Sequence, residues 1–481
     1  MKANLENIHE IYNIFCQKNR MNADIINLFD RFKLSQTLRH LKMEKQQGVS
    51  ASLLIILLCL VRMCHESIGS FYSHKFFGLF ESGKNCFYRM YNRSSMDWRK
   101  LLLRMSVRFM TILKEENAEE NDHPHCFLLD DTTEEKTGAS MEGISRVFDH
   151  VFHKYVLGFK LLLLAYCDGR SSIPVDFSLH REKGKNKTYG LSAEERKSQF
   201  CKERNQNDAD YERYKELDMD KISSAIAMLK RAWKQGLKAS YVLCDSWFTE
   251  ETLIREVKNL SDGKMHVLGM AKMGNRRYKV NGFMLNAHEM ITKYLRCKGK
   301  SDYKHKTFLK YIQLNGMIGD QCVRIFLIKY GCNKNWNIII TSDTTISFDK
   351  CFETYQMRWN IEVMNKECKQ YLGLGKYQGR DFDGQIADCT LCFITYTLLA
   401  LDKRFSEYET MGELFGDHRS DLMALTLWRR ILEMILAILE TLSDVMSIDV
   451  DELTENLLNN ETAAKKYAVM LNALQEYDKA A

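Results

Sequence analysis

Three acidic positions in this sequence are placed where they could bind divalent metal ions. Asp130 and Asp131 come directly after the apolar run 127–129, and Asp245 comes directly after the apolar run 242–244. A side chain at the end of a buried strand leaves the apolar layer but is still held rigidly, which suits a ligand-binding group. Taken alone, an Asp in this position is more often a helix cap or a turn residue than a metal ligand.

The third acid, Glu362, lies on a helix that we predict over residues 352–372. Four residues on this helix, at 100 degrees per residue, fall within about 60 degrees of arc: Tyr355, Arg358, Glu362 and Lys369. Apolar residues such as Ile361 and Met364 occupy the other side and are expected to pack into the core. The alternative is the solvated charged face of an ordinary amphipathic helix, but phosphate chemistry requires an acid flanked by cations in this way.

The elements that must position these acids are strands and helices in alternation. We predict adjacent strands over 126–129, 155–166 and 172–177, with antiparallel hairpins joined near Asp168-Gly169. A polar helical stretch, 191–236, leads to a buried strand over 241–244, a helix over 250–257 and a strand over 266–271. Residues 273–348 are rich in strand patterns and contain an Asn315-Gly316 turn signal.

Helical periodicity dominates both ends of the chain. Residues 1–120 have apolar side chains at three- and four-residue spacing, including Leu53 to Val61, which we interpret as a buried helix. Helices are predicted again over 386–401, 422–446 and 453–474.

Every spacing in the Tyr355, Arg358, Glu362 and Lys369 set matches the YREK signature, so this part of the chain resembles the DDE transposases of bacterial insertion sequences. The resemblance extends to the Asp-Asp-Thr-Thr and Asp-Ser-Trp-Phe strand ends and to Arg358-Trp359 before Glu362. It covers about residues 126–401 and is loose in the N-terminal part. This branch of the family has a β-strand insertion before its last acid.

The resemblance implies an α/β fold with an RNase H-like mixed sheet flanked by helices. The implied organisation is a helical N-terminal region at 1–120 that is a candidate for DNA binding, a catalytic domain at 121–272 and 349–403, a β-rich insertion at 273–348 and a helical C-terminal region at 404–481.

The implied reaction is cut-and-paste transposition, with strand cleavage and strand transfer at terminal inverted repeats. Asp131, Asp245 and Glu362 would bind Mg²⁺, for which Mn²⁺ can substitute, while Tyr355, Arg358 and Lys369 would contact DNA phosphates. Asp130 is a further catalytic candidate. The family pattern of an acid, the catalytic Asp and then Thr-Thr favours Asp131 over Asp130, although alternation of strand faces leaves the choice open.

The two metal ions would activate water or a 3′-hydroxyl and stabilise the leaving oxygen of an in-line displacement. Crowded carboxylates repel one another and raise their own pKa values unless cations are bound, which supports this assignment independently of the resemblance. The expected partner is double-stranded DNA, both transposon ends and target, with a homodimer in the DNA complex and no membrane. The expected location is the bacterial cytoplasm, associated with the nucleoid.

Composition is consistent with this function without proving it. The chain has 481 residues, a formal net charge of +6 and 45% hydrophobic residues, which is typical of a globular protein with a modest basic excess. Its 15 cysteines are scattered, and Cys389 and Cys392 lie in an apolar run, so buried reduced thiols are expected instead of a zinc site. No signal peptide is predicted, because polar residues occupy the region where its apolar centre would be.

Two basic tracts are further candidates for DNA contact. Lys84 to Arg104 interleaves aromatic with basic residues and is either a helix-turn-helix-like reader of DNA or a basic helix covering the core. Arg181 to Lys187 could line a DNA channel. Trp247 and Trp359 could stack on a displaced base, but we interpret them as core residues because a Trp beside a strand usually is.

Three other functions fit parts of the pattern. A structure-selective nuclease would share the fold, but the full signature and the β insertion argue against it. A DNA-binding remnant of a transposase would have lost an acid or a signature residue, and none is missing. A helical interaction protein would not bind DNA at all, which a mobility-shift experiment tests.

Overall fold

A computed structural model describes residues 28–44, 48–73, 83–119, 122–297, 299–303, 307–330, 335–420 and 422. By their contacts, Asn27–Asp417 form one compact unit, and Met1–Ile26 with His418–Ala481 form another. The features discussed below belong to the first unit. Apart from Leu422, the helices predicted over 422–446 and 453–474 lie outside the described residues.

Helices occupy most of the described N-terminal region, as its periodicity predicts. Helix α4 (Ala51–Met63) begins after Ser50, whose hydroxyl accepts a hydrogen bond from the Leu53 amide, and its apolar residues are largely buried. Helix α7 (Trp98–Glu115) is capped in the same way by Asp97. Three shorter helices complete this region: α3 (Leu34–His40), α5 (Ile68–Ser73) and α6 (Asn85–Tyr91).

One 12-stranded mixed sheet runs through the unit, which confirms the predicted α/β class. Strand β1 (Cys126–Glu135) pairs antiparallel with β3 (Lys154–Cys167) and parallel with β5 (Tyr241–Cys244). The order is β2-β3-β1-β5-β6-β12-β11-β10-β7-β8, with β4 paired to β3 and β9 to β10. The other strands before residue 273 are β2 (Ser145–Asp149), β4 (Ser172–His180) and β6 (His266–Ala271).

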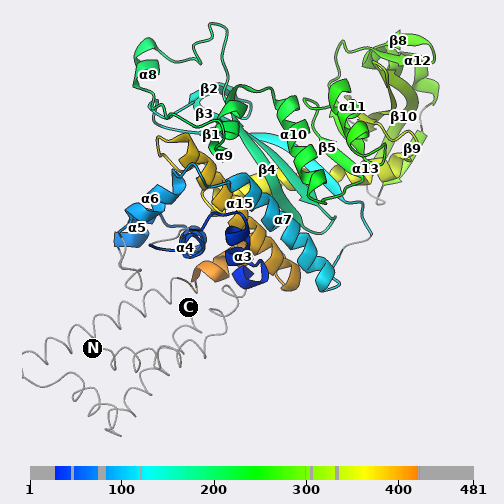
Figure 1. Ribbon diagram of the computed structural model, residues 1–481. Coiled ribbons are helices and arrows are strands. Elements are labelled where there is room, and N and C mark those ends of the chain that lie inside the picture. The colour runs from blue at the N-terminus through cyan, green and yellow to red at the C-terminus, as the bar shows by residue number, and fades with distance from the viewer. Residues whose placement is uncertain are drawn as a thin grey trace, which may run out of the picture. The chain divides into compact units, whose positions relative to one another are not determined.

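Helices cover the sheet on both faces (Figure 1). The long helix α15 (Phe382–Phe405) packs on β4, α7 and α4, and α14 (Trp359–Tyr371) packs on β1. Helix α10 (Lys221–Lys234) packs on β3 and β4, and α11 (Glu251–Leu260) packs on β6. Three short helices precede α10: α8 (Ala193–Ser198), α9 (Ala209–Lys215) and a 3₁₀ turn, η1 (Glu216–Asp218).

The predicted β-rich insertion extends the central sheet. Its last strand, β12 (Trp336–Thr341), pairs antiparallel with β6, so the inserted strands continue the same hydrogen-bonded ladder. The remaining elements are β7 (Tyr278–Val280), β8 (Phe283–Leu285), α12 (Ala287–Tyr294), η2 (Leu295–Cys297), β9 (Gly299–Tyr303), β10 (Thr307–Ile318) and β11 (Gln321–Tyr330).

Several predicted boundaries are wrong. Strand β1 runs through Asp130 and Asp131 to Glu135, so these two acids lie within a strand and not at its end. Strand β2 is absent from the predicted elements. The predicted Asn315-Gly316 turn lies inside β10, and the chain reverses at Gly319, which has a φ of 55°. The helix predicted over 352–372 is two helices, α13 (Phe348–Gln356) and α14, separated at Met357 and Arg358.

Helix α15 is long and apolar enough to cross a membrane, but its apolar window is entirely buried within the protein. It is therefore a core helix. Cys389 and Cys392 are buried free thiols within it. Of the described cysteines, only Cys201 and Cys322 are exposed, which confirms the prediction of mostly buried thiols.

Strand β4 lies at an edge of the sheet, since among the described strands it pairs only with β3. The pairing contains a β-bulge between Leu164 and Ala165, opposite the region of Pro174. On its other side, β4 contacts helices: the Ser106 hydroxyl donates to the Pro174 carbonyl at 2.7 Å, and the Arg213 guanidinium donates to the Phe177 carbonyl.

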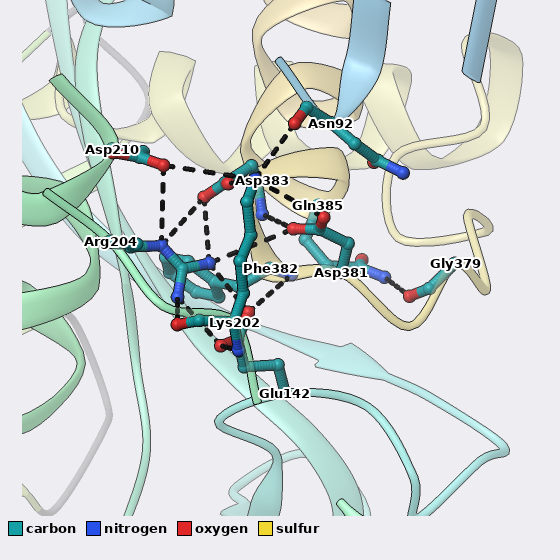
Figure 2. A network of polar contacts seen from close by, with 10 residues as sticks. All are labelled: Asn92, Glu142, Lys202, Arg204, Asp210, Gly379, Asp381, Phe382, Asp383 and Gln385. Atoms are coloured by element: carbon teal, nitrogen blue, oxygen red, sulfur yellow. Dashed lines mark hydrogen bonds and ion pairs between the residues drawn. The ribbon is translucent and has the colours of Figure 1, made fainter. Parts of the chain in front are cut away.

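A buried charge cluster fixes the start of α15, and we call it the Arg204 network. Figure 2 shows Arg204 between Glu142 and Asp383, with Nη to carboxylate distances of 2.7 Å to both Glu142 oxygens and 3.0 Å to Asp383 Oδ1. Glu142 also accepts the Phe382 amide at 3.2 Å. The other charged members of the network are Lys202, Asp210 and Asp381.

Residues between β1 and β2 also bind the segment that follows α14. The Glu142 amide donates to the Arg380 carbonyl at 2.9 Å, and the ammonium of Lys136, just beyond β1, donates to the Gly375 and Tyr377 carbonyls at 2.9 and 3.1 Å. The segment that follows α14 is thus fastened to the connection between β1 and β2.

We expect Asp210→Asn to stabilise the protein at pH 8 and to leave its stability at pH 4 nearly unchanged. Burial and the neighbouring Asp383 carboxylate raise the pKa of Asp210 to about 6. The folded state therefore binds this proton more tightly than the unfolded state, and the resulting stability is lost as the pH rises through about 6. The gain at pH 8 should be on the order of 1–2 kcal/mol, measured by urea unfolding at both pH values. A gain of equal size at both would contradict the assignment.

Candidate active site

The two adjacent acids of β1 point to opposite faces of the sheet, because side chains alternate along a strand. Thr132 shares a face with Asp130, and its hydroxyl accepts a hydrogen bond from Lys369 of α14 at 2.6 Å. Thr133 shares the other face with Asp131 and accepts a hydrogen bond from Lys160 of β3 at 2.9 Å. Asp130 therefore faces the α14 side, and Asp131 faces the α10 side.

Asp245 directly follows β5 and is in register with Asp130 of β1. The parallel pairing of β1 and β5 ends at Leu129 and Cys244, so the next residues in register are Asp130 and Asp245. Partners in a parallel pair point to the same face, which places both carboxylates on the α14 side. A turn fixes Asp245, because its Oδ1 accepts the Trp247 amide at 2.9 Å and its carbonyl accepts the Thr249 hydroxyl at 3.0 Å.

Glu362 lies in the first turn of α14, where its charge interacts favourably with the helix dipole. The guanidinium of Arg358, at the helix start, pairs with it at 2.5 Å from Nη2 to Oε1. The Glu362 side chain is 33% exposed and that of Arg358 is 14% exposed, so solvent reaches Glu362 more readily than Arg358. The Arg358 Nε atom is buried and has no hydrogen-bond partner among the described residues.

Charges on both faces of β1 act on Asp130. Burial and the neighbouring Asp131 carboxylate raise the pKa of Asp130 to about 7. Asp245 and Glu362 also raise it, whereas Arg358 lowers it. A carboxyl group in such surroundings is costly to ionise unless a cation is close.

The remaining signature residues also reach β1 and β5. Lys369, near the end of α14, donates to the Thr133 carbonyl at 2.9 Å as well as to Thr132, and burial lowers its pKa. The Tyr355 hydroxyl, on α13, donates to the Cys244 carbonyl at 3.4 Å. The Arg358 guanidinium lies 5.7 Å from the centre of the Tyr355 ring. Because of the break between α13 and α14, the four signature residues do not share one helical stripe.

Asp131 has a different set of neighbours. Its carboxylate pairs with the ammonium of Lys221, the first residue of α10. On the same face, His180 of β4 bonds to the Ser178 hydroxyl at 2.7 Å and to the Met219 carbonyl at 3.0 Å. Burial and the nearby Lys221 lower the pKa of His180 to about 4. The structure thus brings Asp130, Asp245 and Glu362 to one face and places Asp131 on the other, where a lysine neutralises it.

The core interpretation of the two tryptophans is wrong. Trp247, two residues after Asp245, is 46% exposed, and Trp359, next to Arg358, is 59% exposed. The Lys221 ammonium lies 5.2 Å from the centre of the Trp247 ring. Trp247 lies two residues after the strand-end acid and Trp359 directly follows the signature arginine, and this sequence context was the available signal that the two rings are not core residues.

The two basic tracts differ in the structure. In Lys84 to Arg104 the aromatic residues Phe87, Tyr91 and Trp98 are buried, which supports the alternative of basic helices covering the core. In Arg181 to Lys187, Arg181 pairs with Asp218 through two hydrogen bonds, whereas residues 183–187 are exposed.

Among the described residues, no three His, Cys, Asp or Glu side chains are gathered tightly enough to ligate one metal ion. In this arrangement Arg358 neutralises Glu362, so binding a metal would require Glu362 to exchange this partner for the ion. The three carboxylates of the α14 face do provide the hard oxygen ligands that Mg²⁺ prefers. Their crowding around Asp130 is the kind of environment that a divalent cation stabilises.

Part of the chain matches a known family. Residues 81–269 match the model of the DDE superfamily endonucleases, a family that acts on DNA and generally depends on divalent metal ions. The matched segment includes Asp130, Asp131 and Asp245 and ends before the β insertion and Glu362. The match is consistent with a DDE transposase. No curated protein matches the chain.

Proposed function

We propose that the protein is a DDE transposase of the YREK branch, which cuts DNA at terminal inverted repeats and joins the ends to a target. The observation that carries this proposal is the convergence of Asp130, Asp245 and Glu362 on one face of the sheet, beside Arg358. We assign Asp130 as the first catalytic acid in place of Asp131, which lies on the opposite face.

Asp130, Asp245 and Glu362 would hold the Mg²⁺ ions. When bound, these ions supply the acidity that activates an attacking oxygen and the charge that stabilises a leaving one. Asp245 is held in a tight turn and Asp130 in the middle of a paired strand, so both carboxylates are positioned before substrate binds. Glu362 is the mobile member, because it exchanges its pairing with Arg358.

The cationic signature residues would bind the DNA backbone. If Glu362 binds metal, the Nη atoms of Arg358 become free to donate to a phosphate. Lys369 uses two of its three donors on β1, which leaves one for a phosphate oxygen. The exposed ring of Trp359, next to Arg358, offers a flat surface on which a base can stack.

Arg358→Ala and Lys369→Ala should each bind DNA more weakly and with a shallower dependence on salt. For every phosphate that the protein no longer neutralises, the slope of log K against log salt concentration should fall by about 0.9. Fluorescence anisotropy with a labelled duplex at several salt concentrations measures this slope. Lys230→Ala, which removes an exposed lysine of α10, is the control. Unchanged slopes in both variants would show that these residues have only a structural role.

The proposed function is tested with DNA that carries the flanking repeats of the element itself. We expect strand cleavage that requires Mg²⁺ or Mn²⁺ and the appearance of joined products with a target plasmid. Asp245→Ala and Glu362→Ala should abolish cleavage but retain DNA binding, because these acids hold metal and not DNA. Cleavage without joining would indicate a nuclease instead. We further propose that two copies act together in the DNA complex, which the measured mass of that complex tests. The complex would form at the bacterial nucleoid.

A further inference from the structure

The β2–β3 hairpin ends in an exposed tip that contains aromatic and basic residues. Val151, Phe152 and Tyr155 are 80%, 67% and 66% exposed, an unusual set of apolar side chains for a solvated turn. Lys154 lies between them, with its ammonium 5.4 Å from the centre of the Phe152 ring. Residues 150–155 are all exposed.

A second exposed segment, 183–187, is attached to the same hairpin. The Phe148 amide of β2 donates to Glu182 Oε2 at 3.1 Å, and the Glu182 amide donates to the Ser145 hydroxyl at 3.0 Å. The Arg146 amide donates to the Tyr189 carbonyl at 2.9 Å. The loop that carries Lys183, Lys185 and Lys187 therefore lies along β2. We call residues 150–155 and 183–187 together the basic-aromatic tip.

The charge of this surface is of one sign. The two segments have the sequences His-Val-Phe-His-Lys-Tyr and Lys-Gly-Lys-Asn-Lys and contain no acidic residue. The neighbouring acids are engaged within the protein: Asp149 accepts the Val151 and Phe152 amides, Glu182 accepts the Phe148 amide, and Asp218 pairs with Arg181 and, at 3.9 Å, with Lys183 of the tip. A polyanion is the partner that such a surface attracts.

Hydrogen bonds also hold the backbone of the tip in place, which favours binding. The Asp149 side chain closes the hairpin turn with hydrogen bonds of 2.8 and 3.0 Å, and the Tyr189 amide closes the lysine loop on the Lys183 carbonyl at 3.0 Å. The Arg181 guanidinium packs 4.1 Å from the centre of the Tyr189 ring. Little conformational entropy remains to be lost when a partner binds.

We propose that the basic-aromatic tip is a second DNA-contacting element, separate from the acids of the candidate active site. Its lysines bind phosphates, and Phe152 and Tyr155 insert against bases. Lys154 lies nine residues along β3 from Leu163, the partner of Asp130, or about 30 Å at 3.3 Å per residue. That length corresponds to about nine base pairs of duplex. The inference rests on the proposed function, because it requires a DNA substrate.

The test compares DNA binding by three variants of the full chain, without divalent metal, on a labelled 40-base-pair duplex of arbitrary sequence. Phe152→Ala with Tyr155→Ala should weaken binding at least about tenfold, because one stacked base contributes 1–3 kcal/mol. Its salt slope should not change. Lys183→Gln with Lys185→Gln and Lys187→Gln should reduce the slope by about 2–3.

The control is Phe405→Ala, which removes another exposed aromatic beside a cation, since Arg31 lies 4.8 Å from the Phe405 ring centre. It should bind DNA like the unmodified protein. If the unmodified protein binds DNA and both tip variants match it in affinity and slope, the proposal is wrong. A change in self-association alone, measured by sedimentation, would also overturn it, by showing that the tip contacts a second copy. If the unmodified protein fails to bind DNA, the proposed function itself fails.

Discussion

Asp130→Asn is expected to abolish DNA cleavage, whereas Asp131→Asn should leave measurable activity. Asp130 shares a face and a register position with Asp245 and lies within the electrostatic reach of Glu362. Asp131 pairs with Lys221 on the opposite face, so its loss acts on the metal site indirectly, through the position of β1 and through its charge effect on Asp130. Loss of such a supporting partner typically costs 10- to 100-fold, and loss of a direct ligand costs more.

Single-turnover cleavage at several Mg²⁺ and Mn²⁺ concentrations separates the two roles. Asp131→Asn activity should rise with added metal, and Asp130→Asn should stay inactive throughout. Lys221→Met is the matched control, because it removes the partner of Asp131 without touching a carboxylate. It should resemble Asp131→Asn. The reverse ranking of the two Asn variants would return the catalytic role to Asp131, as the family pattern favours.

Arg204→Met is expected to destabilise the protein by about 3–5 kcal/mol, the usual result of removing one partner from a buried ion pair. The Arg204 side chain is 3% exposed, and its removal leaves Glu142, which is 1% exposed, without its cation and leaves Asp383 paired with Lys202 alone. Urea unfolding monitored by circular dichroism measures the change in the free energy of unfolding.

Two further variants make this measurement specific. Lys230→Met breaks an exposed pair with Glu256 and should cost about 0–1 kcal/mol. Adding Glu142→Gln to Arg204→Met should recover part of the lost stability, because the buried carboxylate that lost its partner is then replaced by a neutral amide. If Arg204→Met costs no more than Lys230→Met, the network contributes little to stability, and another interaction must hold the start of α15.

The order of strands and helices could be predicted from sequence because it depends on local hydrophobic patterns. Strands β5 and β6 match their predicted limits. The predicted strand β1 ends too early because its second half, Asp-Asp-Thr-Thr-Glu-Glu, has the polar composition of a loop. Pairing with β3 along its whole length makes it a strand, and such tertiary pairing overrides local preference.

Gly316 shows why one turn signal failed. An Asn-Gly pair usually marks a hairpin turn, but here a Cβ atom at Gly316 would lie 2.9 Å from the Lys279 carbonyl of β7. The glycine permits two strands to approach closely, and this contact depends on a segment more than 30 residues away. No local pattern could indicate it.

The candidate site, too, could be predicted only in part, because some of its features depend on contacts between distant segments. The residue types and spacing indicated Asp245, Glu362 and the cations around them. The choice between Asp130 and Asp131 required the register of β1 against β5, and the break at Arg358 has no glycine or proline to mark it. The exposure of Trp247 and Trp359 depends on helix packing that hydrophobicity alone does not predict.

The edge strand β4 bears on how so large a sheet avoids aggregation. An exposed edge offers unpaired amides and carbonyls on which another chain can add a strand. Here Pro174 has no amide to offer, the nearby bulge interrupts the regular ladder, and Ser106 and Arg213 already occupy the Pro174 and Phe177 carbonyls. At the far end of the strand order, β8 has only three residues, too few to template a long cross-β contact. These two edges therefore discourage the edge-to-edge pairing that leads to amyloid-like assembly.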